Sequence, residues 1–216
     1  MVVDHGYNQI YSGTNFQKVE ALKKLALFDF DGTLTTKDTF IEFIKFYRGT
    51  VSFYLGFMLL SPLLVLYKLK VIPNWRAKEY VLTYFFKGEP IDKFNEKGKA
   101  FSEKLIPKMI RKQALDKFNG HIEREDVVVI VSASAANWVK PWADKQGVEI
   151  IATNLEVKNN SITGKILGRN CYGPEKVARI QRNINIGDYS EIHVYGDSRG
   201  DREMLDLATH AFYRKF

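Results

Sequence analysis

The feature that most constrains this fold is a short, almost wholly apolar run at residues 25–30, which stops abruptly at Asp31-Gly32-Thr33. A strand that is apolar on both faces is typical of a parallel sheet covered by helices on both sides. Similar runs follow at residues 127–131, 149–152, 192–195 and 210–213. Helix-like segments lie between them, so we predict an α/β fold, a Rossmann-like parallel sheet with helices on both faces.

Residues 36–120 interrupt this alternation. They read as successive helices at residues 39–47, 75–86 and 91–118, around an apolar stretch. About eighty residues are too many for a crossover connection, so we predict an all-helical cap inserted after the first strand. We predict an N-terminal tail at residues 1–24 and a cap domain at residues 37–120. The core domain is predicted in two pieces, residues 25–36 and 121–216.

Positive charge is concentrated in the predicted cap. The chain carries a formal net charge of +7, and residues 37–120 alone hold sixteen Lys and Arg against eight Asp and Glu. Such a basic segment raises the hypothesis of a nucleic-acid-binding module, but it matches no nucleic-acid-binding motif, so we expect no nucleic acid partner. The single cysteine, Cys171, excludes a disulfide framework and is typical of a cytoplasmic protein.

Polar residues follow the predicted strands where ligands bind in open α/β sheets, beyond the carboxyl ends. They are Asp29, Asp31, Gly32, Thr33, Ser132, Asp197 and Asp201. Turn formation explains any one of them but not the whole set. Asp29 and Asp197 can hold a hard cation such as Mg²⁺, which would let a carboxylate approach a phosphate. Lys176 can add positive charge, and Ser132 with the backbone N–H groups after it can cradle phosphate oxygens.

Four segments resemble motifs of the haloacid dehalogenase (HAD) superfamily. Residues 28–35, FDFDGTLT, are similar to its DxDGT[LV] signature, and residues 129–132 to its second motif. Lys176 resembles the third motif, and residues 196–201, GDSRGD, resemble the fourth. The resemblance covers about residues 25–213, and the gap between the first two motifs holds a helical cap, as in the phosphoserine-phosphatase-like subfamily.

This resemblance implies a role for each matching residue. Asp29 would be the nucleophile that forms an aspartyl-phosphate, and Asp31 the general acid and then the general base. Mg²⁺ would bind the side chains of Asp29 and Asp197 and the backbone carbonyl of Asp31. Asp201 would orient the metal's water and Lys176. The phosphate would contact Lys176 and residues of the first two motifs, namely Gly32, Thr33, Ser132 and Ala133.

Residue identities narrow the activity further. Dehalogenases lack the second aspartate and P-type ATPases carry threonine there, so Asp31 implies a phosphatase or a phosphomutase. Gly200 stands where phosphoserine phosphatases carry asparagine, so a phosphate contact is lost or Arg199 supplies it. Asp38 replaces a glutamate that reads the substrate ammonium in those enzymes. Asp38, Arg199 and Arg76 are therefore our candidate substrate contacts.

Residues 49–67 contain no charged side chain and are flanked by Arg48, Lys68 and Lys70. Nineteen residues lie near the lower limit for a membrane span, and we expect Pro62 to divide the stretch into two short helices. Three alternatives follow: a helix pair in the cap core over the active site, peripheral docking of residues 49–70 on an anionic membrane, or a span.

A second resemblance concerns the substrate. Three features are similar to the phosphatidylglycerophosphatase C family. They are Asp38 and Phe40 after the signature, the apolar stretch, and residues 173–176, GPEK. That family removes phosphate from phosphatidylglycerol phosphate at the inner membrane. The resemblance implies a lipid phosphate substrate and association with the inner face of the cytoplasmic membrane. The alternative is the same chemistry on a soluble metabolite such as phosphoserine or a sugar phosphate.

Overall fold

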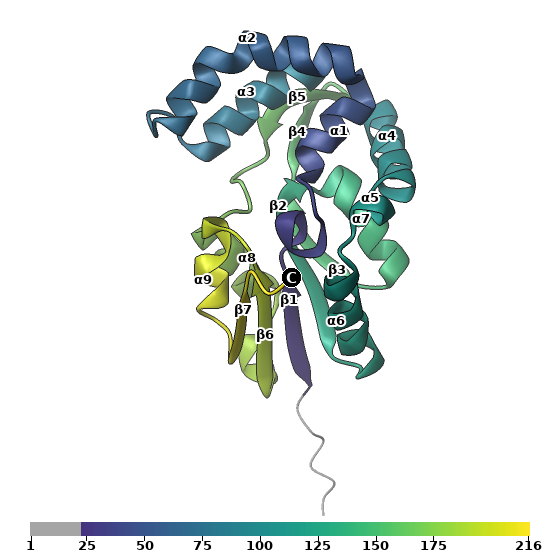
Figure 1. Ribbon diagram of the computed structural model, residues 1–216, viewed down its shortest axis with the longest axis vertical. Coiled ribbons are helices and arrows are strands. Elements are labelled where there is room, and N and C mark those ends of the chain that lie inside the picture. Colours follow the sequence, from purple (N-terminus) through teal and green to yellow (C-terminus); the bar gives the residue numbers. More distant parts are fainter. Residues whose placement is uncertain (1–22) are drawn as a thin grey trace, which may run out of the picture.

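The computed structural model describes residues 23–216, so the predicted tail lies almost entirely outside the described residues. Its centre is a parallel sheet with the strand order β3-β2-β1-β6-β7 (Figure 1). The strands are β1 (Lys24–Phe28), β2 (Val127–Ala135), β3 (Glu149–Thr153), β6 (Glu191–Gly196) and β7 (His210–Tyr213). This confirms the predicted α/β fold and all five predicted strands.

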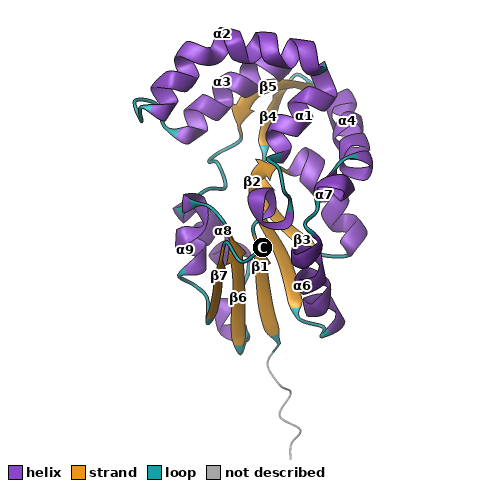
Figure 2. Ribbon diagram, viewed as in Figure 1, coloured by secondary structure: helices purple, strands orange, loops and turns teal. Residues whose placement is uncertain are grey.

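The two faces of β1 pack against different helices because successive side chains of a strand point to opposite sides. Leu25 and Leu27 join a cluster with residues of α8 (Pro174–Asn183) and α9 (Arg202–Leu205). Phe28 joins a larger cluster with residues of α6 (Lys112–Glu123) and α7 (Ala136–Gln146). The helices therefore cover both faces of the sheet, as Figure 2 shows.

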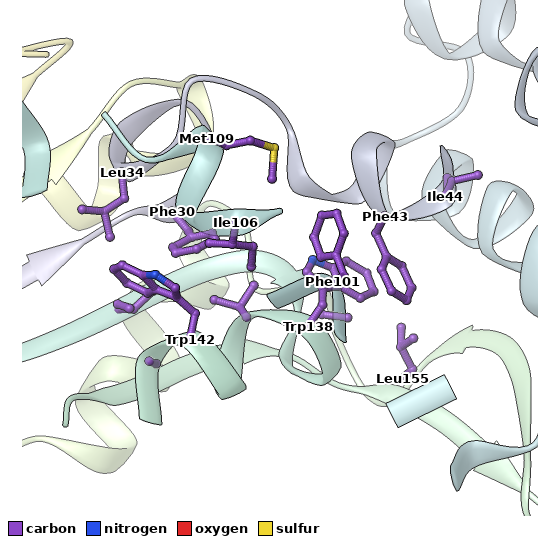
Figure 3. Close-up of a cluster of buried hydrophobic side chains, with 14 of the residues drawn as sticks. Phe30, Leu34, Phe43, Ile44, Phe101, Ile106, Met109, Trp138, Trp142 and Leu155 are labelled. Atoms are coloured by element: carbon purple, nitrogen blue, oxygen red, sulfur yellow. The ribbon is translucent and has the colours of Figure 1, made fainter. Parts of the chain in front are cut away.

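The larger cluster continues from the sheet into the inserted helices (Figure 3). Phe43 stacks on Trp138 with ring centroids 4.6 Å apart and meets Phe101 edge-on at 5.3 Å. Close approach of α4 to α7 depends on Gly98, where a Cβ would lie 2.3 Å from the carbonyl oxygen of Asn137. The inserted helices and the sheet thus share one apolar core.

The insertion follows β1 and the turn Phe30–Leu34. Its helices are α1 (Thr39–Arg48), α2 (Thr50–Lys68), α3 (Asn74–Phe86), α4 (Ile91–Lys104) and α5 (Ile106–Met109). We predicted one continuous helix over residues 91–118. This prediction is wrong, because the segment is divided among α4, α5 and α6. The chain is extended at Ile110, which bridges to Thr35, and Arg111 N–H bonds to the Leu34 carbonyl at 2.8 Å. The two linkers between sheet and cap therefore run side by side.

Helix α2 is one continuous helix, so the predicted division at Pro62 is wrong. Proline has no N–H to donate to the carbonyl four residues back, which is that of Met58. The Ser61 hydroxyl donates to this carbonyl instead, at 2.7 Å. The missing backbone bond is therefore replaced locally, and the helix continues through the proline.

An antiparallel hairpin of β4 (Leu155–Lys158) and β5 (Ser161–Ile166) was not predicted. Its turn residues, Asn159 and Asn160, have φ angles of 48° and 58°, a conformation that asparagine tolerates well. The hairpin packs against α3, where Gly88 N–H bonds to the Ile162 carbonyl at 2.8 Å. It thus lies with the cap helices, although it follows β3 in the chain (Figure 1).

Candidate active site

Lys176, at the start of α8, is the centre of a buried ion cluster. Its Nζ donates to Asp29 Oδ1 at 2.6 Å, to Asp201 Oδ1 at 2.7 Å and to the Val131 carbonyl at 2.6 Å. Its side chain and that of Asp201 are each only 1% exposed. The site therefore brings together residues that are far apart in the chain, and all three donors of the ammonium are used.

Burial and charge affect the two carboxylates of this cluster differently. Burial raises the pKa of Asp29 to about 8, although the Lys176 ammonium opposes the shift. Burial also acts to raise the pKa of Asp201, but the charge of Lys176 and hydrogen bonds from Lys176 and Ser198 outweigh it, so this pKa is lowered. Asp201 thus remains a carboxylate that fixes the position of Lys176.

Asp31 is held by two hydrogen bonds that the sequence did not predict. Its Oδ1 accepts from the backbone N–H of Thr39 at 2.6 Å, and its Oδ2 accepts from the Ser134 hydroxyl at 2.5 Å. Burial and the nearby charge of Asp38 raise the pKa of Asp31, while these hydrogen bonds oppose the rise. A fixed carboxyl group with a raised pKa suits a proton donor.

Gly32 allows the first and fourth motifs to meet. Its φ is +85°, and a Cβ at this position would lie 2.3 Å from Asp197 Oδ2. Beside it, the Thr33 hydroxyl donates to Asp29 Oδ2 at 3.2 Å and to Asp197 Oδ1 at 3.5 Å. Glycine is therefore needed both for the left-handed backbone and for the close approach of Asp197.

The donor set here fits a hard cation. Asp29, Asp197 and Asp201 each offer a carboxylate oxygen, and these oxygens lie within 4.8 Å of one another. Asp201 accepts bonds from Lys176 and, through Oδ2, from Ser198 N–H at 2.9 Å, so both of its oxygens are engaged. Burial and the charge of Asp201 raise the pKa of Asp197.

A cavity of about 340 Å³ opens over this cluster. Six of the predicted site residues line it, namely Asp29, Asp31, Asp38, Ala133, Lys176 and Asp201. Apolar side chains also line it, among them Phe57 and Leu64 of α2. Ser132 is buried, and its hydroxyl accepts from Ser134 N–H at 3.0 Å, so the cavity wall is formed by the next two residues of the strand.

The predicted substrate contacts lie at different distances from this cavity. Asp38 lines it and also caps α1, accepting from Ile41 N–H at 3.1 Å. Arg76 is exposed, with its guanidinium over the ring of Trp75, and it is not part of the lining. Lys78, three residues after Trp75, does line the cavity, and it was not among the predicted substrate contacts.

Gly200 lies against an aromatic ring. A Cβ at Gly200 would come within 2.3 Å of the ring of Tyr172, which lines the cavity. Arg199, in the turn Arg199–Asp201, is exposed and does not line the cavity. Tyr172 thus occupies the space that a side chain at position 200 would need.

Residues 26–206 match the family model of the haloacid dehalogenase-like hydrolases. The chain belongs to this family. A relative, protein CicA of Caulobacter vibrioides, is 34% identical over 194 residues, which cover 89% of this chain and 86% of CicA. The chain is accordingly an enzyme of the HAD-like hydrolase family.

Solved structures share the fold of this HAD-like hydrolase. A Bordetella pertussis protein of unknown function superposes with a TM-score of 0.73 and 25% identity, covering 88% of each chain. A phosphoserine phosphohydrolase-like protein from Francisella tularensis gives 0.62 and 15%, over 88% and 85% of the two chains. A phosphoserine phosphatase solved as a phospho-aspartyl intermediate analogue gives 0.56 and 24%, over 86% and 83%. The last two matches concern the fold alone.

Proposed function

We propose that this protein is a Mg²⁺-dependent phosphomonoester hydrolase that works through an aspartyl-phosphate on Asp29. The observation that carries the proposal is the pairing of Asp29 with the buried Lys176, 2.6 Å away, at the base of a cavity that Asp31 also lines. Asp29, Asp197 and the backbone carbonyl of Asp31 would hold Mg²⁺, which offsets the negative charge of the phosphoryl group.

Mg²⁺, when bound, would favour the ionised form of Asp29. In the first step, a carboxylate oxygen of Asp29 bonds to phosphorus and the ester bond to the alcohol breaks. Asp31 gives its proton to the departing alcohol oxygen. In the second step Asp31, now a carboxylate, takes a proton from water as the water oxygen bonds to phosphorus. The Asp29–phosphorus bond breaks and inorganic phosphate leaves. The positive charge of Lys176 would attract the phosphoryl oxygens, which Thr33 and the backbone at Ala133 would orient.

The substrate we favour is a lipid phosphate such as phosphatidylglycerol phosphate. Helix α2 is long and apolar enough to cross a membrane, alone among the helices of residues 23–216, and only Phe53 and Gly56 of it are buried. The same helix lines the cavity through Phe57 and Leu64. We interpret α2 as a peripheral docking element on an anionic membrane. A soluble metabolite such as phosphoserine or a sugar phosphate is the alternative substrate.

The catalytic assignment is tested with Asp29→Asn. This variant should lose turnover of an aryl phosphate in the presence of Mg²⁺, because the amide cannot attack phosphorus. Asp116→Asn, at an exposed position on α6, should retain turnover. Undiminished hydrolysis by Asp29→Asn would refute the assignment, and so would full activity in the presence of a chelator.

The choice of substrate is tested by co-sedimentation with phosphatidylcholine vesicles, with and without phosphatidylglycerol. Binding that requires the anionic lipid supports the lipid phosphate. Absence of binding to both vesicle types, together with turnover of water-soluble phosphomonoesters, supports the soluble metabolite.

A further inference from the structure

Lys78 extends from the cap into the active-site cavity. Its Nζ donates to the Ala133 carbonyl at 2.6 Å and lies 5.4 Å from the centroid of the Phe40 ring. The side chain is half-buried and lines the cavity together with Asp31 and Asp38. A cap cation therefore lies directly beside the strand end that we assign to phosphate binding.

The hydrogen-bonding capacity of Lys78 is only partly used. An ammonium has three N–H donors, and within residues 23–216 the Ala133 carbonyl is the hydrogen-bond acceptor that Nζ reaches. No carboxylate in that part of the chain lies within 4.0 Å of it, in contrast to Lys176, whose three donors all have acceptors. Burial lowers the pKa of Lys78, and the charges of Asp31 and Asp38 oppose this. Within residues 23–216 this cation is thus influenced by the charges of Asp31 and Asp38 but forms no ion pair with them.

We propose that Lys78 is an anion-binding residue for the alcohol part of the substrate, so that the cavity takes phosphomonoesters with a second negative charge near the ester. The proposal rests on the proposed function, because it takes the phosphoryl group to lie at Asp29. Asp31, assigned as proton donor to the alcohol, lines the same part of the cavity as Lys78.

Electrostatics around Lys78 point to an anion there. The Asp29 and Asp201 carboxylates are already paired with Lys176, and both oxygens of Asp31 accept hydrogen bonds. A substrate ammonium would meet the positive charge of Lys78 at short range, where Coulomb repulsion is strong. The lining also includes apolar side chains of α2, among them Phe57 and Leu64. The substrate we infer thus carries an anionic group near the ester and an apolar part.

The test compares three phosphomonoesters whose alcohol parts are anionic, neutral and cationic: 3-phosphoglycerate, glycerol 3-phosphate and phosphoethanolamine. For the unmodified enzyme, kcat/KM should fall in that order, with about tenfold between the first two, the size typical of a charged hydrogen bond. Lys78→Met should bring this ratio close to one, mainly through KM. Lys78→Arg should restore it, and Lys97→Met, exposed on α4, should leave it unchanged.

Calorimetric binding of the same three compounds to Asp29→Asn, with and without Lys78→Met, provides a readout that does not require turnover. Absence of hydrolysis by the unmodified enzyme would refute the proposed function, but this binding series would still test Lys78. A preference between the compounds that is the same with and without Lys78→Met would overturn the inference. Equal binding of all three compounds before the substitution would also overturn it.

Discussion

The catalytic edge of the sheet and helix α2 depart from the usual burial pattern in opposite directions. At the sheet edge, charged side chains are buried, and Lys176 and Asp201 are each 1% exposed. On α2, large apolar side chains face outward, with Met58 and Leu59 63% and 64% exposed. Burying charge costs free energy unless it is paired, and large exposed apolar patches are unusual in monomers. Neither arrangement is favoured by stability, and the proposed function accounts for both, with chemistry at the edge and membrane docking at the helix.

The largest effect is expected from Lys176→Met, which removes the cation from the buried cluster. It should lower the free energy of unfolding by about 3–5 kcal/mol, because the carboxylates of Asp29 and Asp201 are left buried without a cation. Phosphatase turnover should also be lost. Urea unfolding and an aryl phosphate assay measure the two effects, with the exposed Lys97→Met as control. A variant as stable and active as the control would show that the cluster is not needed.

A smaller effect is expected from Gly32→Ala, which affects both the left-handed backbone at this position and the close approach of Asp197. The new methyl group would displace the Asp197 carboxylate and should lower kcat about a hundredfold, as small misplacements in active sites do. Gly147→Ala is the matched control, because its φ is +71° but nothing lies within 4 Å of the new Cβ. It should cost about 1 kcal/mol of stability and leave turnover unchanged. Equal turnover by the two variants would contradict the role of close approach.

Glu89, whose side chain is 12% exposed, is the centre of a second ion cluster, among the cap helices. It accepts from Tyr47 at 2.7 Å and pairs with Arg48 at 2.6 Å and Lys93 at 3.2 Å. Burial acts to raise the pKa of Glu89, but these hydrogen bonds outweigh it and the pKa is lowered. A group whose pKa is lower in the folded state contributes stability above its ordinary pKa of 4.5 and loses it as the pH falls.

Glu89→Gln should therefore lower the free energy of unfolding by about 1–2 kcal/mol at neutral pH. The difference from the unmodified protein should shrink as the pH falls below 4.5. Urea unfolding at several pH values measures it, with the exposed Glu96→Gln as control. A difference that stays constant over this range would exclude the charge of Glu89 as its cause.

The smallest effect on folding is expected at the exposed face of α2. Leu59→Gln should change the free energy of unfolding by less than about 0.5 kcal/mol, while weakening co-sedimentation with anionic vesicles. Phe53→Ala, at a buried position of the same helix, should cost about 3–5 kcal/mol. A large loss of stability in Leu59→Gln would mean that this face supports the fold and would weaken the docking interpretation.

Much of the sheet was predictable because each strand is a short apolar run that is followed by polar residues. The hairpin was missed because its two strands are short and half-exposed, although the Asn159-Asn160 pair between alternating residues is a hairpin signal. The continuity of α2 depends on the Ser61 hydroxyl, which a rule for proline alone does not include.

The residues of the candidate site could likewise be predicted only where the signal lies in the local sequence. Asp29, Asp31, Lys176 and Asp197 stand out as polar residues at strand and helix ends. The partners Thr39 and Ser134 of Asp31, and the contact between Lys78 and Ala133, join segments that meet only after the cap has packed on the sheet. The residue types alone do not indicate these contacts unless the fold is known.

The cap is attached to the sheet domain at more than its two linkers. Helix α4 lies tightly on α7 at Gly98, and the hairpin after β3 is bonded to the turn after α3. A lid fastened at several separate places has no single hinge about which to swing. Exchange of substrate and product would then depend on movement of α2, of which only Phe53 and Gly56 are buried. On a membrane, the surface that receives α2 would also govern how often the cavity opens.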